Sequence, residues 1–313
     1  MIRKRSAKPS ASKLLLWTVG LLLFFVMIGV LIQTGREREK NDVAPSVFPQ
    51  NTKTDNAQPA QTASPDSNKP SPGVPGAIVL TPEKNAVKQS SQPLIALIID
   101  DLGQVDLALV SRICSLNIPM TVAILPFLPH SHDSARVANS RGLEVILHMP
   151  MEPVGYPGLG KNPGPGAVMS VQSEAEVRER VVSAMRDIPF AVGLNNHMGS
   201  RITPDRARMA WILDEAKKNN WFFLDSRTEK DTVAMEVARE LGIPALERKV
   251  FLDDSHNPAE IAHQWERAMA LAKQEGQVVI IGHIHLETIA FLEKAIPAVK
   301  NEMVFVRASV LAR

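Results

Sequence analysis

The sequence predicts an α/β protein whose folded domain is a distorted (β/α) barrel of seven or eight strands, preceded by one transmembrane helix and a disordered linker. Three observations predict this organisation. Short apolar runs alternate with helical patterns along residues 93–313, an uncharged apolar segment lies near the N-terminus, and the stretch between the two is polar. The chain therefore divides into residues 1–34, 35–92 and 93–313.

The first part, residues 1–34, is typical of a membrane anchor. Leu14–Ile32 contains no charged residue, and as a helix it would be roughly 28 Å long, close to the ~30 Å hydrocarbon core of a bilayer. Arg3, Lys4, Arg5, Lys8 and Lys13 precede it, so the N-terminus is expected in the cytoplasm and the rest in the periplasm or another extracytoplasmic space. A cleaved signal peptide is the alternative, although no small-residue cleavage site is evident.

The second part, residues 35–92, is rich in Pro, Ser, Asn and Gln and has very few large apolar residues. Such a composition cannot bury enough apolar surface to offset the entropy of ordering. We expect a flexible tether.

The third part repeats a β-α pattern. The apolar runs are continuous, which is typical of strands buried on both faces of a parallel sheet. They are Leu94–Ile99, Met120–Leu125, Leu143–Leu147, Ala191–Leu194, Trp221–Leu224, Val250–Leu252, Val278–Ile281 and Met303–Val306. The expected helices are Val105–Leu116, Ser131–Ser140, Ser173–Arg186, Asp205–Asn219, Lys230–Leu241, Pro258–Gln274 and Glu287–Ala295. Seven or eight such units favour a barrel over the alternative of a doubly wound sheet.

Composition excludes some classes of function. The net charge is only +2, aromatic residues make up 5% of the chain and there is one Tyr, so nothing indicates a nucleic-acid partner. The single Cys cannot form an internal disulfide. No Gly-x-Ser-x-Gly turn or Gly-rich phosphate loop is present, which argues against a serine nucleophile and against a phosphate-binding enzyme.

Acidic and imidazole side chains follow several of the predicted strands. They are Asp100, Asp101, His148, Glu152, His197, Asp225, Asp253, Asp254, His256, His283 and His285. In (β/α) barrels functional residues lie at the carboxyl ends of the strands. Clustered carboxylates repel one another unless a cation offsets them, and imidazole with carboxylate is a typical ligand set for zinc and related divalent metals.

Several of these residues also have a purely structural interpretation. Asp100 and Asp101 could cap the following helix, as could Asp253 and its neighbours before Pro258. Asp225 and Arg227 could orient a neighbouring group or a substrate.

Five segments of this domain resemble the divergent polysaccharide deacetylase family, a branch of the carbohydrate esterases. They are Ile98-Ile-Asp-Asp-Leu-Gly103, Leu147-His-Met-Pro-Met-Glu152, Asn195-Asn-His-Met-Gly-Ser200, Phe223-Leu-Asp-Ser-Arg227 and Gly282-His-Ile-His-Leu-Glu-Thr288. The resemblance implies a distorted barrel of the deacetylase type and a divalent metal, with Zn²⁺ expected. It also implies hydrolytic removal of acetyl groups from an N-acetylated glycan such as peptidoglycan.

The resemblance assigns a role to each matching residue. Asp100 is the expected catalytic base, Asp101 and His148 the expected metal ligands, and His283 the expected proton donor to the leaving group. Glu152 stands where the wider superfamily has a second histidine ligand.

The third ligand is therefore expected to be His197, with Glu152 as the fallback. No counterpart of the superfamily's Arg-x-Pro-Tyr motif is present, so Arg201 or Arg227 is expected to supply the positive group. The alternative function is a glycan-binding or scaffold protein of the cell envelope that keeps a metal only for structure.

Overall fold

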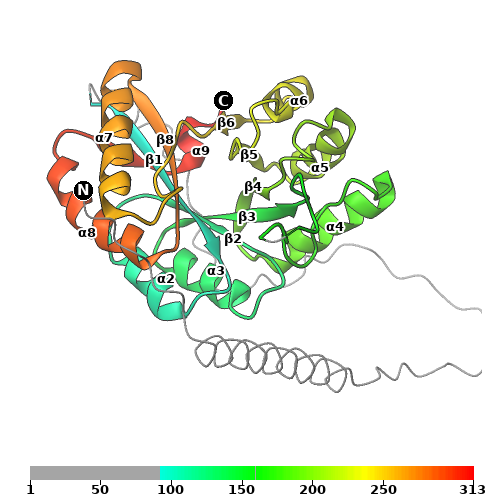
Figure 1. Ribbon diagram of the computed structural model, residues 1–313, viewed down its shortest axis with the longest axis horizontal. Coiled ribbons are helices and arrows are strands. Elements are labelled where there is room, and N and C mark those ends of the chain that lie inside the picture. The colour runs from blue at the N-terminus through cyan, green and yellow to red at the C-terminus, as the bar shows by residue number, and fades with distance from the viewer. Residues whose placement is uncertain (1–91, 159) are drawn as a thin grey trace, which may run out of the picture. The chain divides into compact units, whose positions relative to one another are not determined.

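A curled, all-parallel sheet with helices on its outer face forms the part of the protein that the computed structural model describes, residues 92–158 and 160–313. Helices α2 to α8 lie around the outside of the strands (Figure 1). The strands are β1 (Leu94–Leu102), β2 (Thr121–Ile124), β3 (Glu144–Met151), β4 (Ala191–Met198), β5 (Phe222–Asp225), β6 (Ala245–Glu247), β7 (Val250–Phe251), β8 (Gln277–His283) and β9 (Val304–Val306). The helices are α2 (Leu107–Cys114), α3 (Ser131–Ser140), α4 (Glu174–Asp187), α5 (Arg206–Lys218), α6 (Ala234–Leu241), α7 (Pro258–Glu275), α8 (Leu286–Val299) and α9 (Ala308–Leu311).

The strand order, β6-β5-β4-β3-β2-β1-β8-β7 with β9 on β1, shows how the sheet curls. Its first and last strands are neighbours in sequence, separated only by Arg248 and Lys249. The Arg248 N–H donates to the Asp225 carbonyl at 3.0 Å, and the Lys249 N–H donates to the Val279 carbonyl at 2.9 Å. Two consecutive residues therefore bond to β5 and β8, each the second strand from one end of the sheet, which brings those ends together.

The expected distorted barrel of seven or eight strands is thus confirmed as a curled parallel α/β sheet, but the sheet of the described residues has nine strands and does not close. Among the described residues β6 and β7 form no ladder with each other, so one short crossing segment bridges the sheet instead of a complete strand. The doubly wound alternative was wrong, because the strand order follows the sequence from β1 to β6 and the inner face packs on itself.

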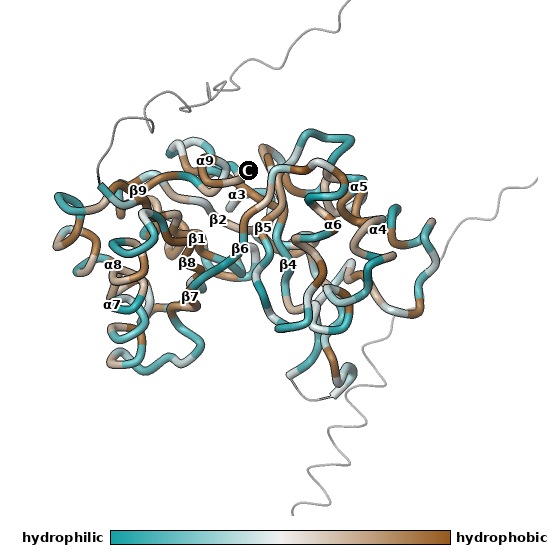
Figure 2. Tube along the Cα trace, turned by 90° about the horizontal axis from the view of Figure 1, so that it is seen from above, coloured by the Kyte–Doolittle hydropathy of each residue, from teal (hydrophilic) through white to brown (hydrophobic). Residues whose placement is uncertain are grey.

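Successive side chains of a strand point to opposite faces of the sheet, so they belong alternately to two apolar clusters. The larger cluster, which includes Ile95, Leu97 and Ile99, packs the sheet against the helices. The smaller cluster fills the interior with Ala96, Ile98 and residues from the other strands. In Figure 2 the hydrophobic colour runs along β1 and β8.

Helix α9 covers the interior at the amino ends of the strands. Its Ala308 and Leu311 belong to the inner cluster. The Ala308 N–H donates to Thr121 Oγ1 at 2.9 Å, and the Ser309 N–H donates to Glu144 Oε1 at 3.1 Å. Helix α9 therefore closes the amino end of the interior with apolar side chains around the buried Thr121 and Glu144, which leaves the carboxyl end for the site.

Some expectations fall outside the described residues or were wrong. The expected anchor Leu14–Ile32 and the linker lie outside them, and within residues 92–158 and 160–313 no helix combines the length and apolarity needed to span a bilayer. Strand β6 and helix α9 were not predicted, since each is only a few residues long. The helix expected from Lys230 begins at Ala234, because Asp225 holds the preceding loop through Thr232 Oγ1 at 2.9 Å.

Candidate metal centre and active site

The inner face of the strands changes from apolar to polar toward their carboxyl ends. On β1 the inward series Ala96 and Ile98 continues to Asp100, and on β8 it ends at His283, the register partner of Asp100. On β3 the series continues to His148, whose register partner on β4 is Asn195. Period two and strand register therefore bring these four side chains to one place.

Asp101 joins them only because β1 is irregular at this point. Alternation alone would turn Asp101 away from Asp100. Between Ile99 and Leu102 the chain advances three residues on β1 against two on β2, which is a β-bulge. Asp101 also has a positive φ of 66°, a left-handed conformation that Asp tolerates better than most residues. The bulge and this conformation turn both carboxylates toward the same site.

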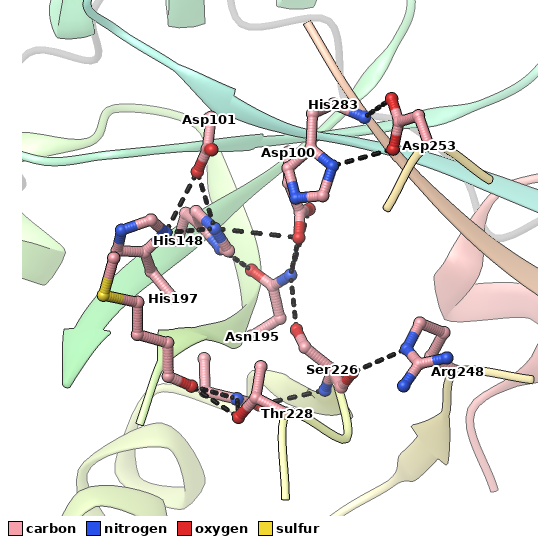
Figure 3. Close-up of polar contacts among 12 residues, drawn as sticks. Asp100, Asp101, His148, Asn195, His197, Ser226, Thr228, Arg248, Asp253 and His283 are labelled. Atoms are coloured by element: carbon pink, nitrogen blue, oxygen red, sulfur yellow. Dashed lines mark hydrogen bonds and ion pairs between the residues drawn. The ribbon is translucent and has the colours of Figure 1, made fainter. Parts of the chain in front are cut away.

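Asp101, His148 and His197 form a compact triangle of potential metal ligands (Figure 3). Asp101 Oδ1 lies 3.1 Å from His148 Nε2 and 3.0 Å from His197 Nδ1. The two imidazole nitrogens are 3.1 Å apart. This is the only cluster of three such ligands found in the described part of the chain.

The triangle fits a divalent cation. Asp101 Oδ1 is buried and accepts no hydrogen bond of acceptable geometry, despite its two imidazole neighbours. Burial raises the pKa of Asp101, but His148 and His197 outweigh it and bring the pKa well below its usual range. A buried carboxylate oxygen and two imidazole nitrogens that converge on one point are a typical donor set for zinc.

Asp100 lies beside the triangle and is almost fully buried. Its Oδ2 is 3.6 Å from His148 Nε2, and both of its oxygens accept from Asn195 Nδ2 at 3.1 Å. Burial raises the pKa of Asp100, although His148 and His283 oppose that effect. A raised pKa is suited to a general base, because it strengthens the affinity of the carboxylate for a proton.

His283 faces the same space from β8 and is held by the buried Asp253. Its Nδ1 is 2.8 Å from Asp253 Oδ1, and its backbone N–H donates to Asp253 Oδ2 at 2.7 Å. Thr288 Oγ1 donates to the same oxygen at 2.5 Å. Burial lowers the pKa of His283, but Asp253, assisted by Asp100 and Asp101, raises it to about 9. The imidazole is therefore protonated at neutral pH and can act as a general acid.

A cavity of about 520 Å³ opens onto the triangle. Asp101 and His197 line it on one side, the Asn162–Pro165 segment forms another wall, and Ile284 and His285 form a third. A molecule of the size of a sugar residue can therefore reach the candidate ligands from solvent.

The four residues expected to bind or orient substrate lie apart from the triangle. The Glu152 carboxylate pairs with Arg201 Nε at 3.1 Å and accepts from the Ser170 N–H at 2.5 Å. Arg227 pairs with Glu247 at 2.7 Å, and Asp225 accepts from the Arg227 N–H at 2.7 Å. The structure therefore places Glu152 in an ion pair rather than in the cluster, so the fallback ligand is not supported.

Two residues that contact the site had no assigned role or an ambiguous one. Asn195 precedes His197 by two positions, so the alternation of a strand could have placed both on the inner face. Asp253 was considered a possible cap for α7, but Asn257 is the cap of that helix. Only the tertiary structure shows that Asp253 contacts His283 from the neighbouring strand end.

The curled parallel fold and this ligand triangle define a class of α/β domains with a candidate metal site at the carboxyl ends of the strands. Residues 97–312 match the family described as divergent polysaccharide deacetylase, and the chain belongs to that family.

Similar proteins occur in several bacteria. The chain is 36% identical over 217 residues to the uncharacterized protein YibQ of Escherichia coli strain K12, covering 69% of this chain and 66% of that protein. It is 35% identical to an uncharacterized protein of Haemophilus influenzae, covering 65% of this chain and 71% of that protein. The crystal structure of an uncharacterized protein from Agrobacterium tumefaciens C58 has the same fold, with a TM-score of 0.66, 22% identity and coverage of 72% of this chain and 91% of that one.

Proposed function

We propose that the domain is a metal-dependent hydrolase that removes acetyl groups from an N-acetylated polysaccharide of the cell envelope, such as peptidoglycan. Its ligands are Asp101, His148 and His197, and its metal is Zn²⁺. Asp100 is the base and His283 the acid. Membership of the deacetylase family supports the substrate class.

The observation that carries the proposal is a cluster of three protein ligands beside an accessible cavity. A structural zinc site is closed by four protein ligands, whereas a catalytic site has three and keeps one position for water or substrate. Asp100 Oδ2 lies 3.6 Å from His148 Nε2, and His283 is the register partner of Asp100 on β8, so a base and an acid accompany the ligands.

The residues of the chain divide the proton transfers of amide hydrolysis between them. A divalent ion on the triangle would polarise the acetyl carbonyl and acidify a water. Asp100 accepts a proton from the attacking water, whose oxygen forms a bond to the acetyl carbon. His283 then donates its proton to the sugar nitrogen as the C–N bond breaks, which yields acetate and an amine.

The alternative is a catalytically impaired glycan-binding or scaffold protein with a structural metal. The ion-paired Glu152, at a position where the superfamily has a ligand, favours this alternative. The three-ligand triangle and the protonated His283 favour the enzyme.

We also propose that Leu14–Ile32 anchors the protein in the membrane, with its N-terminus in the cytoplasm and residues 93–313 in the periplasm, joined by the linker. Basic residues before the apolar segment support this orientation. Protease accessibility of the domain in spheroplasts tests it, and protection of the domain would contradict it.

Acetate release from peptidoglycan fragments and chitin oligomers tests the enzymatic proposal. We expect Asp100→Asn and His148→Ala to lose at least about 100-fold in rate, since general base catalysis and the metal are both worth that much. A chelator should abolish the rate, and Zn²⁺ should restore it.

The exposed Asp254 provides a matched control, because Asp254→Asn removes a charge one position from Asp253 without touching the site. Equal rates in the parent and in both site variants would rule out the scheme. Glycan binding without acetate release would establish the alternative.

A further inference from the structure

The buried carboxylate of Asp100 accepts hydrogen bonds from a neutral amide rather than from an arginine or lysine. Asn195 Nδ2 donates to both of its oxygens at 3.1 Å. Within residues 92–158 and 160–313, no arginine or lysine forms an ion pair with Asp100. Arg201 and Arg227, the expected positive groups, are paired with Glu152 and Glu247 instead.

The other end of the Asn195 amide contacts a ligand of the triangle. Asn195 Oδ1 lies 2.8 Å from His148 Nδ1 and can only accept, so His148 carries its proton on Nδ1. His148 Nε2, which faces Asp101 and His197, then presents a lone pair to the centre of the triangle. A protonated Nε2 could not bind a metal.

The orientation of the amide is determined by its surroundings. Asn195 is fully buried, and its Nδ2 also donates to Ser226 Oγ at 3.2 Å. If the amide were reversed, its oxygen would face the Asp100 carboxylate, and two acceptors would oppose each other. Strand register supports the same arrangement, because Asn195 is the β4 partner of His148.

We propose that Asn195 is a positioning residue that contacts both the ligand triangle and the base: it sets the tautomer of the metal ligand His148 and holds the base Asp100 in place. The part that concerns Asp100 rests on the proposed function. The part that concerns His148 needs only metal binding.

Two substitutions separate these two contacts. Asn195→Ala removes both, so we expect the affinity for Zn²⁺ to fall by about 10- to 100-fold, as for other residues that orient a metal ligand. Asn195→Asp keeps an acceptor for His148 Nδ1 but opposes Asp100. We expect this variant to keep its Zn²⁺ affinity within about threefold of the parent, while kcat for acetate release falls at least about 100-fold with little change in KM.

Asn196→Ala is the matched control. Asn196 is equally buried on the same strand, but its amide donates to the Met198 carbonyl at 2.9 Å and accepts from the Ser226 N–H at 2.9 Å. We expect it to lose thermal stability yet keep its Zn²⁺ affinity within about twofold of the parent. Calorimetric titration with Zn²⁺ and far-UV circular dichroism provide the two measurements.

Long-range ¹H–¹⁵N spectra of the parent protein give a readout that needs no variant. We expect His148 to carry a proton on Nδ1 before and after Zn²⁺ is added, with Zn²⁺ displacing any proton from Nε2. An Nε2–H tautomer, an Asn195→Ala variant with the affinity of the parent, or an Asn195→Asp variant as weak as Asn195→Ala would each overturn the proposal. A parent that binds Zn²⁺ and releases no acetate would refute the proposed function. The affinity and tautomer measurements would still decide whether Asn195 orients His148.

Discussion

Single side chains decide which carboxylate can bind a metal. Asp101 was an expected ligand and Glu152 the fallback to His197 for the third position, and both carboxylates are partly or fully shielded from water. The Glu152 carboxylate is already compensated by Arg201 and by the Ser170 N–H. Asp101 Oδ1 instead lies 3.1 Å from His148 Nε2 and 3.0 Å from His197 Nδ1. A bound cation would therefore offset the negative charge of Asp101, whereas the charge of Glu152 is already offset by Arg201.

Removing each carboxylate tests this difference. We expect Asp101→Asn to weaken Zn²⁺ binding more than about 100-fold, since it removes a direct ligand. Glu152→Gln should keep the affinity within about threefold and should instead lower the free energy of unfolding by about 1–3 kcal/mol, because Arg201 loses its partner. Calorimetry and urea unfolding measure the two effects. Loss of Zn²⁺ binding in Glu152→Gln would restore Glu152 as a ligand.

The pair of His283 and Asp253 predicts a pH dependence. The pKa of His283 is about 9 in the folded protein, above its value of about 6.5 in an unfolded chain. The pair therefore stabilises the fold fully below about pH 6.5, and this contribution is lost as the pH rises through about 9. The alkaline limb of acetate release should lie near the same pH, because His283 must be protonated to act as the acid.

Asp253→Asn should move that alkaline limb toward neutral pH. In this variant the free energy of unfolding should also fall less steeply above pH 7 than in the parent. Rate–pH profiles and thermal unfolding at several pH values measure both effects. Asp254→Asn is the control and should leave both unchanged. An unshifted limb in Asp253→Asn would show that another group is the acid.

At the scale of elements, the end of β1 is the feature on which the site depends. A regular strand would direct Asp100 and Asp101 to opposite faces. The β-bulge and the positive φ of Asp101 bring them to one face, at the cost of a conformation that most residues avoid.

Substitutions at position 101 can measure that cost. Both Asp101→Ala and Asp101→Gly remove the ligand, but only Gly adopts a positive φ freely. We expect Asp101→Ala to be less stable than Asp101→Gly by about 1 kcal/mol. Urea unfolding of the metal-free variants makes the comparison. If the Ala variant is the more stable, the backbone at Asp101 is not left-handed in solution.

At the scale of the whole molecule, the interior of the described domain is closed at one end and carries the candidate site at the other. Helix α9 and the inner cluster fill the amino end of the strands, and the ligand triangle lies at the carboxyl end. Glycine at position 193 permits this filling, since a Cβ there would lie 2.7 Å from the Phe222 ring. The packed amino end provides the rigid base on which the ligands are placed.

Two leucines test the contribution of that packing. Leu311 is buried in the inner cluster, whereas Leu286 is 56% exposed at the start of α8. We expect Leu311→Ala to lower the free energy of unfolding by about 2–4 kcal/mol, and Leu286→Ala to change it by less than about 0.5 kcal/mol. Urea unfolding compares them, and similar losses would show that α9 does not pack as described.

Much of the fold could be predicted because parallel strands and amphipathic helices leave strong local patterns. The eight apolar runs each correspond to a strand, and the seven long helices were expected close to their observed bounds. The capping box of Ser173 and Glu176 at the start of α4 is such a local pattern, because its two residues are three positions apart. Strand β6 was missed because it depends on pairing with β5, and a three-residue segment has no periodicity of its own.

The sequence by itself determined the class of fold, the family, and the residue types that gather at the strand ends, because these depend on local patterns and on short motifs. The tertiary structure decided which of those residues meet. It separated His197 from Glu152, paired Asp253 with His283, and placed Asn195 between Asp100 and His148. Such contacts depend on strand register, on one bulge and on the curl of the sheet. Alternation along β4 can place Asn195 and His197 on one face, but local patterns do not determine which residues of other strands they meet.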